Sequence, residues 1–217
     1  MTHYPSLLAV ALLTLLGCGN DPEASQHVEV AKGVLSGAMS APPPQPPLTR
    51  DVLDQIVTPV MVARLETRGS FAVIGEIGKN GPVATWSTLD AVTISLKDGV
   101  IVATRGLGGD LMAARVPGLS DLLSNGTRHG RIFTHLNGED QVVRSVFSCT
   151  TSAFGHETIE IVEIKYGVQR FAENCIGEGE SGTFRNDFWV GPAGTLRRSR
   201  QWLGEDLGYI IIEDPKR

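Results

Sequence analysis

The feature that most constrains the fold of this chain is the dipeptide Asp98-Gly99, which lies between two runs of strand-forming residues. Residues 92–97 alternate before the dipeptide, and residues 100–104 are again rich in β-branched side chains. Successive side chains of a strand point to opposite faces, so a period of two predicts strands with one buried face. Asp-Gly readily adopts the positive φ angles that a tight primed turn needs. The sequence therefore predicts an antiparallel hairpin here.

Similar runs recur along the chain from residue 61 onward, separated by turn residues such as those at 79–82, 137–138 and 191–194. We predict strands at residues 71–77, 91–96, 100–104, 131–136, 141–150, 158–166, 168–175, 183–190, 195–201 and 209–213. About nine or ten short strands joined by tight turns predict an all-β fold, an antiparallel barrel or sandwich. We assign this β domain to residues 49–217.

Composition narrows the possible partners. The chain is 41% hydrophobic and 20% charged, which is too apolar for a disordered protein. Its formal net charge is -5. A protein that binds the phosphate backbone needs a basic face, so nucleic acid is not an expected partner.

The first residues resemble an export signal. Residues 7–16 form an almost unbroken apolar run, too short to span a bilayer but suited to the core of a signal peptide. The tetrapeptide at 15–18, Leu-Leu-Gly-Cys, is typical of a bacterial lipoprotein. We therefore expect a signal peptide over residues 1–17 and a lipid such as palmitate on Cys18. In the alternative, Cys18 is merely an apolar residue of an ordinary signal peptide. Gly19 rather than Asp follows the cysteine, which favours the outer membrane.

Residues 18–48 are expected to form a lipidated segment with a short helix over residues 28–35 and a proline-rich spacer. Five prolines lie within residues 41–47. Such a run prefers the extended polyproline II conformation and makes a semi-rigid spacer, although it could instead be a ligand for a proline-binding domain. Thr49 is a candidate cap for a short helix that starts at Arg50 and ends before Pro59.

Two cysteines remain after Cys18, at positions 149 and 175. In an oxidising periplasm, two cysteines on neighbouring strands are expected to form a disulfide, here Cys149–Cys175. Their Cα atoms should then lie about 4.4 to 6.8 Å apart. The functional alternative is a catalytic thiol, but neither cysteine belongs to a Cys-x-x-Cys motif.

No catalytic or metal-binding motif is complete. Residues 177–182 match the Gly-x-Gly-x-x-Gly string of dinucleotide-binding proteins, but they precede a predicted strand instead of a helix and include two glutamates. His156-Glu157 starts a zinc-protease string, yet Glu160 replaces the second histidine. We expect no cofactor, no metal and no catalytic residues.

A set of polar and aromatic residues forms the candidate contact surface for a glycan or a protein partner. Indole rings can stack on sugar rings while neighbouring polar groups bind the hydroxyls. The candidates are Trp86, Arg105, Asp110, Asn186, Trp189, Arg200 and Trp202. In the alternative interpretation, the tryptophans fill the barrel interior and the arginines pair with carboxylates.

The segment that follows Arg105 is rich in glycine. Glycines at 106, 108 and 109 allow a turn that could bring Arg105 and Asp110 together. We expect this pair to be structural, with both side chains at least partly buried and hydrogen-bonded to one another or to backbone groups. If the pair is instead a contact site, both side chains should be exposed beside an aromatic residue.

The run from Val92 to Leu111, the cysteine pair and the segment 199–202 together resemble the YjbF/GfcB family of lipoproteins, which is associated with group 4 capsule and exopolysaccharide production. The resemblance implies a mostly antiparallel, barrel-like fold. It also implies an outer-membrane accessory to polysaccharide secretion that works with an outer-membrane β-barrel protein and periplasmic secretion proteins. It brings no enzymatic activity. The alternatives are a polysaccharide-modifying hydrolase or lyase and a purely structural envelope lipoprotein.

Overall fold

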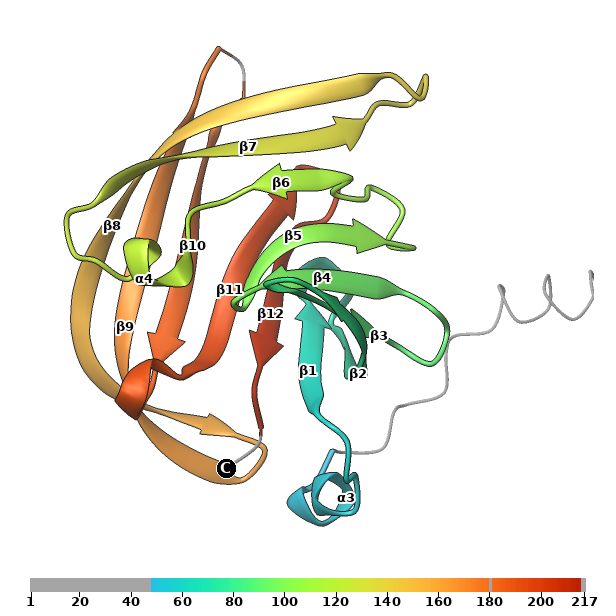
Figure 1. Ribbon diagram of the computed structural model, residues 1–217, viewed down its shortest axis with the longest axis vertical. Coiled ribbons are helices and arrows are strands. Elements are labelled where there is room, and N and C mark those ends of the chain that lie inside the picture. Colours follow the sequence, from blue (N-terminus) through green and yellow to red (C-terminus); the bar gives the residue numbers. More distant parts are fainter. Residues whose placement is uncertain (1–47, 180, 216–217) are drawn as a thin grey trace, which may run out of the picture. The chain divides into compact units, whose positions relative to one another are not determined.

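Twelve antiparallel strands form one sheet that curls into a nearly closed barrel in the computed structural model (Figure 1). The structure describes residues 48–179 and 181–215. These residues lie in one compact unit, which starts at Leu48. The predicted signal peptide 1–17, the lipidation site Cys18, the predicted helix 28–35 and the proline-rich segment 41–47 lie outside the described residues.

The strands and helices of this unit are short except for one long hairpin. The strands are β1 (Val60–Leu65), β2 (Ser70–Asn80), β3 (Val83–Ser87), β4 (Thr93–Lys97), β5 (Val100–Arg105), β6 (Ala113–Arg115), β7 (Arg128–Leu136), β8 (Val142–Ile161), β9 (Ile164–Gly177), β10 (Thr183–Val190), β11 (Leu196–Gly204) and β12 (Gly208–Glu213). The helices are α3 (Arg50–Asp54) and α4 (Leu119–Leu122), and 3₁₀ turns lie at Glu66–Arg68 and Pro192–Gly194.

The strand order makes this an up-and-down barrel with one seam. With one exception, each strand pairs with its neighbour in sequence, and β12 returns to pair with β1. In the described chain, β5 and β6 are the one sequential pair without strand pairing. The amide of Thr104 nevertheless donates to the carbonyl of Leu111 across this seam, over 2.9 Å. From α4, Leu122 packs with Val100 of β5 and Phe188 of β10, so the helix fills the interior near the seam.

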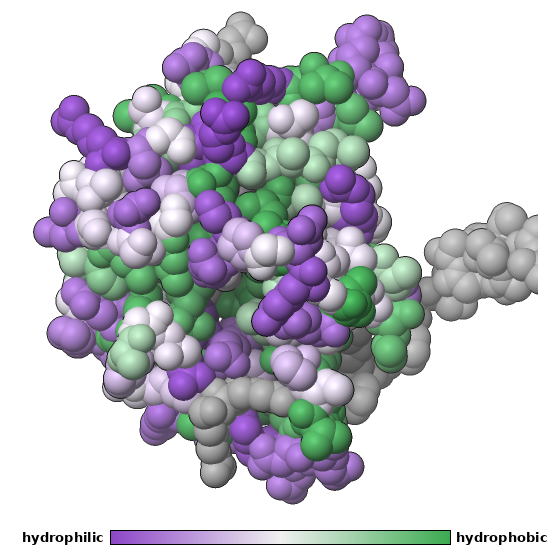
Figure 2. Space-filling view, in the orientation of Figure 1, coloured by the Kyte–Doolittle hydropathy of each residue, from purple (hydrophilic) through white to green (hydrophobic). Residues whose placement is uncertain are grey.

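The barrel interior is apolar and aromatic over most of its length. Phe184 and Trp202 stack with ring centroids 4.6 Å apart, and both lie within 6 Å of Phe133 and Phe147. Opposite-wall residues such as Ile94 belong to the same buried cluster. On the outside, Figure 2 shows polar and apolar side chains interspersed over the face that it presents. Neither of the helices in the described part of the chain has the length and hydropathy needed to cross a bilayer.

The predicted fold class is confirmed, and of its two alternatives the barrel is the one observed. The Asp98-Gly99 hairpin is also confirmed, with φ angles of 51° and 84°. Thr49 does lie at the N-cap of α3, but its side chain makes no capping hydrogen bond. The helix ends at Asp54 instead of continuing to the residue before Pro59.

The predicted strand at 158–166 is wrong, because a hairpin turn interrupts it at Val162 and Glu163. These two residues have φ angles of 40° and 66°, and neither is a glycine, asparagine or aspartate. Gly167, which separates the predicted strands 158–166 and 168–175, lies inside β9. The prediction failed because the long pairing of β8 with β9 imposes a turn for which the local residues carry no signal. Strands β1, β3 and β6 were missed, and β6 has only 3 residues.

Candidate functional site

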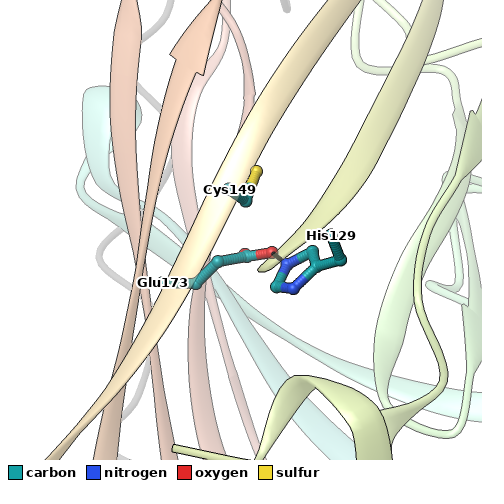
Figure 3. Close-up of side chains that lie close together, drawn as sticks. All are labelled: His129, Cys149 and Glu173. Carbon is teal, nitrogen blue, oxygen red and sulfur yellow. Dashed lines mark hydrogen bonds and ion pairs between the residues drawn. The ribbon is translucent and has the colours of Figure 1, made fainter. Parts of the chain in front are cut away.

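A buried polar cluster lies on the inner face of β7, β9 and β10. Glu173 accepts hydrogen bonds from Arg131 Nε at 2.6 Å and Asn186 Nδ2 at 2.7 Å, and lies 2.5 Å from His129 Nε2. Glu173 is 0% exposed and Arg131 is 1% exposed. Figure 3 shows the His129 ring and the Glu173 carboxylate pointing toward one another beside Cys149. The cluster is enclosed by the barrel wall.

The charge of Glu173 is set by these partners. Burial alone would raise the pKa of this carboxyl group, because it removes water from the charged form. The charge of Arg131 and the hydrogen bonds from His129, Arg131 and Asn186 outweigh burial and lower the pKa to about 2. Glu173 is therefore ionised at neutral pH and is not a proton donor. Its role in this arrangement is to neutralise a buried arginine.

The same cluster holds the strongest candidate metal ligands in the described residues. Ligand atoms of His129, Cys149 and Glu173 lie within 4.8 Å of one another. However, Cys149 is bonded to Cys175, which confirms the predicted disulfide. A disulfide sulfur is not a thiolate ligand, and Arg131 already neutralises Glu173. These residues do not fit a resident metal ion.

The disulfide joins residues directly opposite each other on β8 and β9. Their Cα atoms are 4.1 Å apart, a little closer than the separation expected from the sequence. Directly opposed residues of antiparallel strands can approach to about 4.5 Å, so a cross-strand bond falls at the short end of the usual separations.

Three of the candidate contact residues lie in the core or against it. Trp86 is 6% exposed and Asn186 is 1% exposed, so neither offers a surface to a polymer. Asn186 also accepts a hydrogen bond from the amide of Trp202 at 2.8 Å, which links β10 to β11. Trp202 is half-buried in the aromatic cluster. Their interactions support the fold.

Arg105 and Asp110 bind backbone groups instead of each other, which is one of the two arrangements expected of a structural pair, although Arg105 is exposed instead of partly buried. Asp110 accepts hydrogen bonds from the hydroxyl of Thr104 at 2.9 Å and from the amides of Gly106 and Leu107. Gly106 has a φ of 89°, a backbone conformation that favours glycine. Arg105 is exposed, and its guanidinium donates to backbone carbonyl oxygens of the same loop. The loop is therefore organised by Asp110.

This geometry predicts that the Asp110 side chain contributes more to the stability of the fold than the Arg105 side chain does. Asp110→Ala should lower the free energy of unfolding by about 2 kcal/mol, because the Thr104 hydroxyl and two amides lose their acceptor. Arg105→Ala should lower it by less than about 1 kcal/mol, because the side chain is exposed. Urea unfolding of the two variants would measure both values. Equal losses would contradict the assignment.

The outer face of β8 to β11 carries a continuous row of arginine and aromatic side chains. In register, Arg170 of β9 lies opposite Trp189 of β10, and Trp189 lies opposite Arg198 of β11. Directly opposed residues share a face of the sheet, so these side chains are neighbours. The Cζ atoms of Arg170 and Arg198 lie 5.2 and 5.8 Å from the Trp189 ring centroid.

A β-bulge adds a second aromatic ring to this row. Ala153 pairs with Phe171 and Gly155 pairs with Arg170, so Phe154 is the extra residue of β8. Its ring is 58% exposed and lies 4.7 Å from Arg185 Cζ. We name this set the aromatic–arginine strip: Phe154, Arg170, Arg185, Trp189 and Arg198.

Carboxylates hold the side chains of the strip in place. Asp187 accepts hydrogen bonds from Arg170 and Arg185, Glu157 accepts one from the Trp189 indole, and Glu213 accepts one from Arg198 Nε at 2.6 Å. These bonds orient the guanidinium and indole groups before any ligand arrives.

Arg200 lies beside the strip, since it pairs in register with Asp187. Its Nε and Nη2 donate to Glu66 at 2.7 and 2.8 Å, and its Cζ lies 3.4 Å from the ring centroid of Tyr209. The hydrogen bonds to Glu66 raise the pKa of the Arg200 guanidinium above its ordinary value, so the group stays charged. Of the seven candidates, Trp189 and Arg200 are the two brought together on this outer face.

The strip opens into a groove of about 490 Å³, within the size range of ligand sites. Trp189 and Arg198 form part of one wall, and residues of β1, β2 and β12 contribute others: Val62, Arg64, Phe71, Ile211 and Glu213. Glu160 also lines it. The groove thus has two carboxylates, Glu160 and Glu213, and Glu213 forms an ion pair with Arg198. The groove combines aromatic surface with hydrogen-bonding groups, which is the chemistry of a sugar-binding surface.

Sequence reasoning missed four members of the strip, Phe154, Arg170, Arg185 and Arg198. The alternation within residues 183–190 and 196–204 could have identified two of them, because Arg185 shares a face with Trp189 and Arg198 shares a face with Arg200. Phe154 carried no such signal, since a bulge sets its position.

Comparison with known families decides the relationship of this chain. The family described as group 4 capsule polysaccharide lipoprotein GfcB, YjbF, matches residues 31–214. The chain belongs to the YjbF family. Membership associates it with capsule polysaccharide production and with exported, membrane-associated lipoproteins. No match was found among curated proteins.

One solved structure shows the same fold as this YjbF-family chain. The hypothetical lipoprotein YmcC from Escherichia coli K12 aligns with a TM-score of 0.69 and 20% sequence identity, over 77% of this chain and 88% of that chain. An exported protein from Bacteroides fragilis, described as having a YmcC-like fold, aligns with a TM-score of 0.36 and 10% identity, over 71% of this chain and 92% of the other.

Proposed function

We propose that this protein is a non-enzymatic, lipid-anchored accessory of capsule or exopolysaccharide export that binds the polysaccharide along the aromatic–arginine strip. The observation that carries the proposal is the register row Arg170, Trp189 and Arg198, which continues into the groove. A linear polymer can lie across neighbouring strands and stack on Phe154 and Trp189. Its hydroxyl groups would bind the guanidinium donors between the rings.

The cellular part of the proposal follows from the family and from the amino-terminal sequence. Cys18 would anchor the protein at the periplasmic face of the outer membrane, beside an outer-membrane β-barrel protein and periplasmic secretion proteins. Deleting the gene should then reduce exported polysaccharide. Wild-type protein should restore export fully, whereas the unanchored Cys18→Ser variant should not. Fatty-acid labelling equal in both proteins would contradict the anchor.

Binding can be measured directly with polysaccharide purified from the producing strain. Phe154→Ala and Trp189→Ala should each weaken binding about tenfold, the equivalent of about 1.4 kcal/mol from one lost stacking surface. Phe154 is the cleaner position, because it is 58% exposed and its removal leaves the core intact. Titration calorimetry gives the dissociation constants.

A matched control is Leu89→Ala, which removes a fully exposed apolar side chain from the turn between β3 and β4. This variant should bind as the wild type does. Thermal unfolding of the Trp189→Ala variant separates loss of contact from loss of fold, because Trp189 also packs on Ile159 and Ile161. If folded Phe154→Ala and Trp189→Ala variants bind with unchanged affinity, the strip is not the binding surface.

A further inference from the structure

The aromatic–arginine strip has one point at which positive charge is in excess. Arg170 and Arg185 both bind the same atom, Oδ1 of Asp187, through four hydrogen bonds of 3.0 to 3.2 Å. Two guanidinium groups thus share one carboxylate. The neighbouring arginines differ, because Arg198 has Glu213 and Arg200 has Glu66 as its own partner.

The free donors of this pair point to a ligand with acceptor atoms. Asp187 accepts one hydrogen bond from Nε and one from Nη2 of each arginine, which leaves the second Nη2 hydrogen, and no hydrogen bond from either Nη1 group is present in the described chain. A guanidinium edge of this kind matches the two oxygens of a carboxylate. Glu157, the other nearby carboxylate of the strip, is hydrogen-bonded to the Trp189 indole and forms no ion pair with Arg170 or Arg185.

The pair is held rigidly, so its geometry exists before binding. The Asp187 side chain is only 6% exposed, whereas those of Arg170 and Arg185 are 32% and 39% exposed. The Phe154 ring lies near both arginines, with its centroid 5.8 Å from Arg170 Cζ and 4.7 Å from Arg185 Cζ. Fixing the donors in advance reduces the entropy lost on binding.

We infer that the strip selects a polysaccharide that carries carboxylate groups, and that Arg170 and Arg185 bind the carboxylate of an acidic sugar whose ring lies against Phe154 or Trp189. This inference rests on the proposed function of the same strip. A neutral sugar would meet the same rings but would leave the excess charge without a counter-ion.

The test compares polygalacturonate with the same polymer after chemical reduction of its carboxyl groups, which leaves a neutral galactan. Wild-type protein should bind polygalacturonate at least about tenfold more tightly at low ionic strength, and the ratio should fall as salt is added. In the triple variant Arg170→Gln, Asp187→Asn, Arg185→Gln the ratio should fall to about one. Changing Asp187 together with the arginines avoids leaving a buried carboxylate without a partner.

Two further variants control for the number of charges and for the geometry of the guanidinium groups. Arg115→Gln with Arg144→Gln removes two exposed arginines from β6 and β8 that form no ion pair in the part of the chain that the structure describes, and it should keep the wild-type ratio. Arg170→Lys with Arg185→Lys keeps the charge but loses the planar fork, and should retain only part of the preference.

The outcomes separate the inference from the proposed function. Equal binding of both polymers by the wild type, or no binding of either, overturns the carboxylate preference. An equal loss of preference in the Arg115 and Arg144 control also overturns it, because the preference would then reflect diffuse charge. The proposed function stands or falls separately, on the native polysaccharide and the Phe154→Ala and Trp189→Ala variants.

Discussion

Glu173→Gln is expected to lower the free energy of unfolding by about 3 to 5 kcal/mol, the usual cost of breaking a buried ion pair. The amide has almost the shape of the carboxylate, so packing changes little. Arg131, which is 1% exposed, would nevertheless lose its counter-ion inside the barrel. Equilibrium unfolding in urea measures the loss, and a change below about 1 kcal/mol would contradict the assigned role.

A double variant tests whether the cost comes from the unpaired arginine. Arg131→Met combined with Glu173→Leu removes both charges and leaves apolar side chains of comparable size. Replacing a buried ion pair in this way is often neutral or stabilising. The double variant should therefore be more stable than Glu173→Gln alone. The result would show that the cost in Glu173→Gln comes from the unpaired buried arginine.

The pH dependence of stability gives an independent measurement. Folding lowers the pKa of Glu173 from 4.5 to about 2. The folded state therefore holds the proton less tightly than the unfolded state. The resulting stabilisation, about 3 kcal/mol, is fully present above pH 4.5 and is lost as the pH falls toward 2. Glu173→Gln should lack this component, so its difference from the wild type should shrink in acid.

Alternation and turn chemistry were enough to predict the class of this fold. Asp98-Gly99 marked a hairpin because the turn residues and the flanking strands agreed. Val162 and Glu163 form an equally tight turn with residues that do not favour positive φ. There the pairing of strands distant in sequence determined the turn, and no local pattern carries that information.

The candidate site was predictable only in part for a related reason. Trp86 and Trp189 were equally good candidates for contact residues from the sequence, yet Trp86 lies in the core and Trp189 lies on the outer face. Which face a side chain occupies depends on register, and register depends on bulges such as the one at Phe154. The ion-paired arginines were expected as one alternative. That these arginines lie around the same two aromatic rings could be seen only from the strand register of the barrel.

The Cys149–Cys175 bond is the second feature whose removal should have a large effect. A cross-link between residues separated by 26 positions should stabilise the folded state by about 3.5 kcal/mol in the chain-entropy model. It lies far along the β8–β9 hairpin from the turn at Val162 and Glu163. Because that turn contains no glycine, the disulfide is also expected to help fix the register on which Phe154 and Glu173 depend.

Cys149→Ala with Cys175→Ala should therefore lower the melting temperature by about 10 °C for a domain of this size. Wild-type protein unfolded in the presence of a thiol reductant controls for the lost sulfur atoms, because it loses the cross-link but keeps the packing. Both samples should also show a steeper dependence of stability on urea, since an uncross-linked unfolded chain exposes more surface. If the reduced wild type unfolds at the same urea concentration as the oxidised protein, the bond does not stabilise the barrel, and register must come from the strand pairing alone.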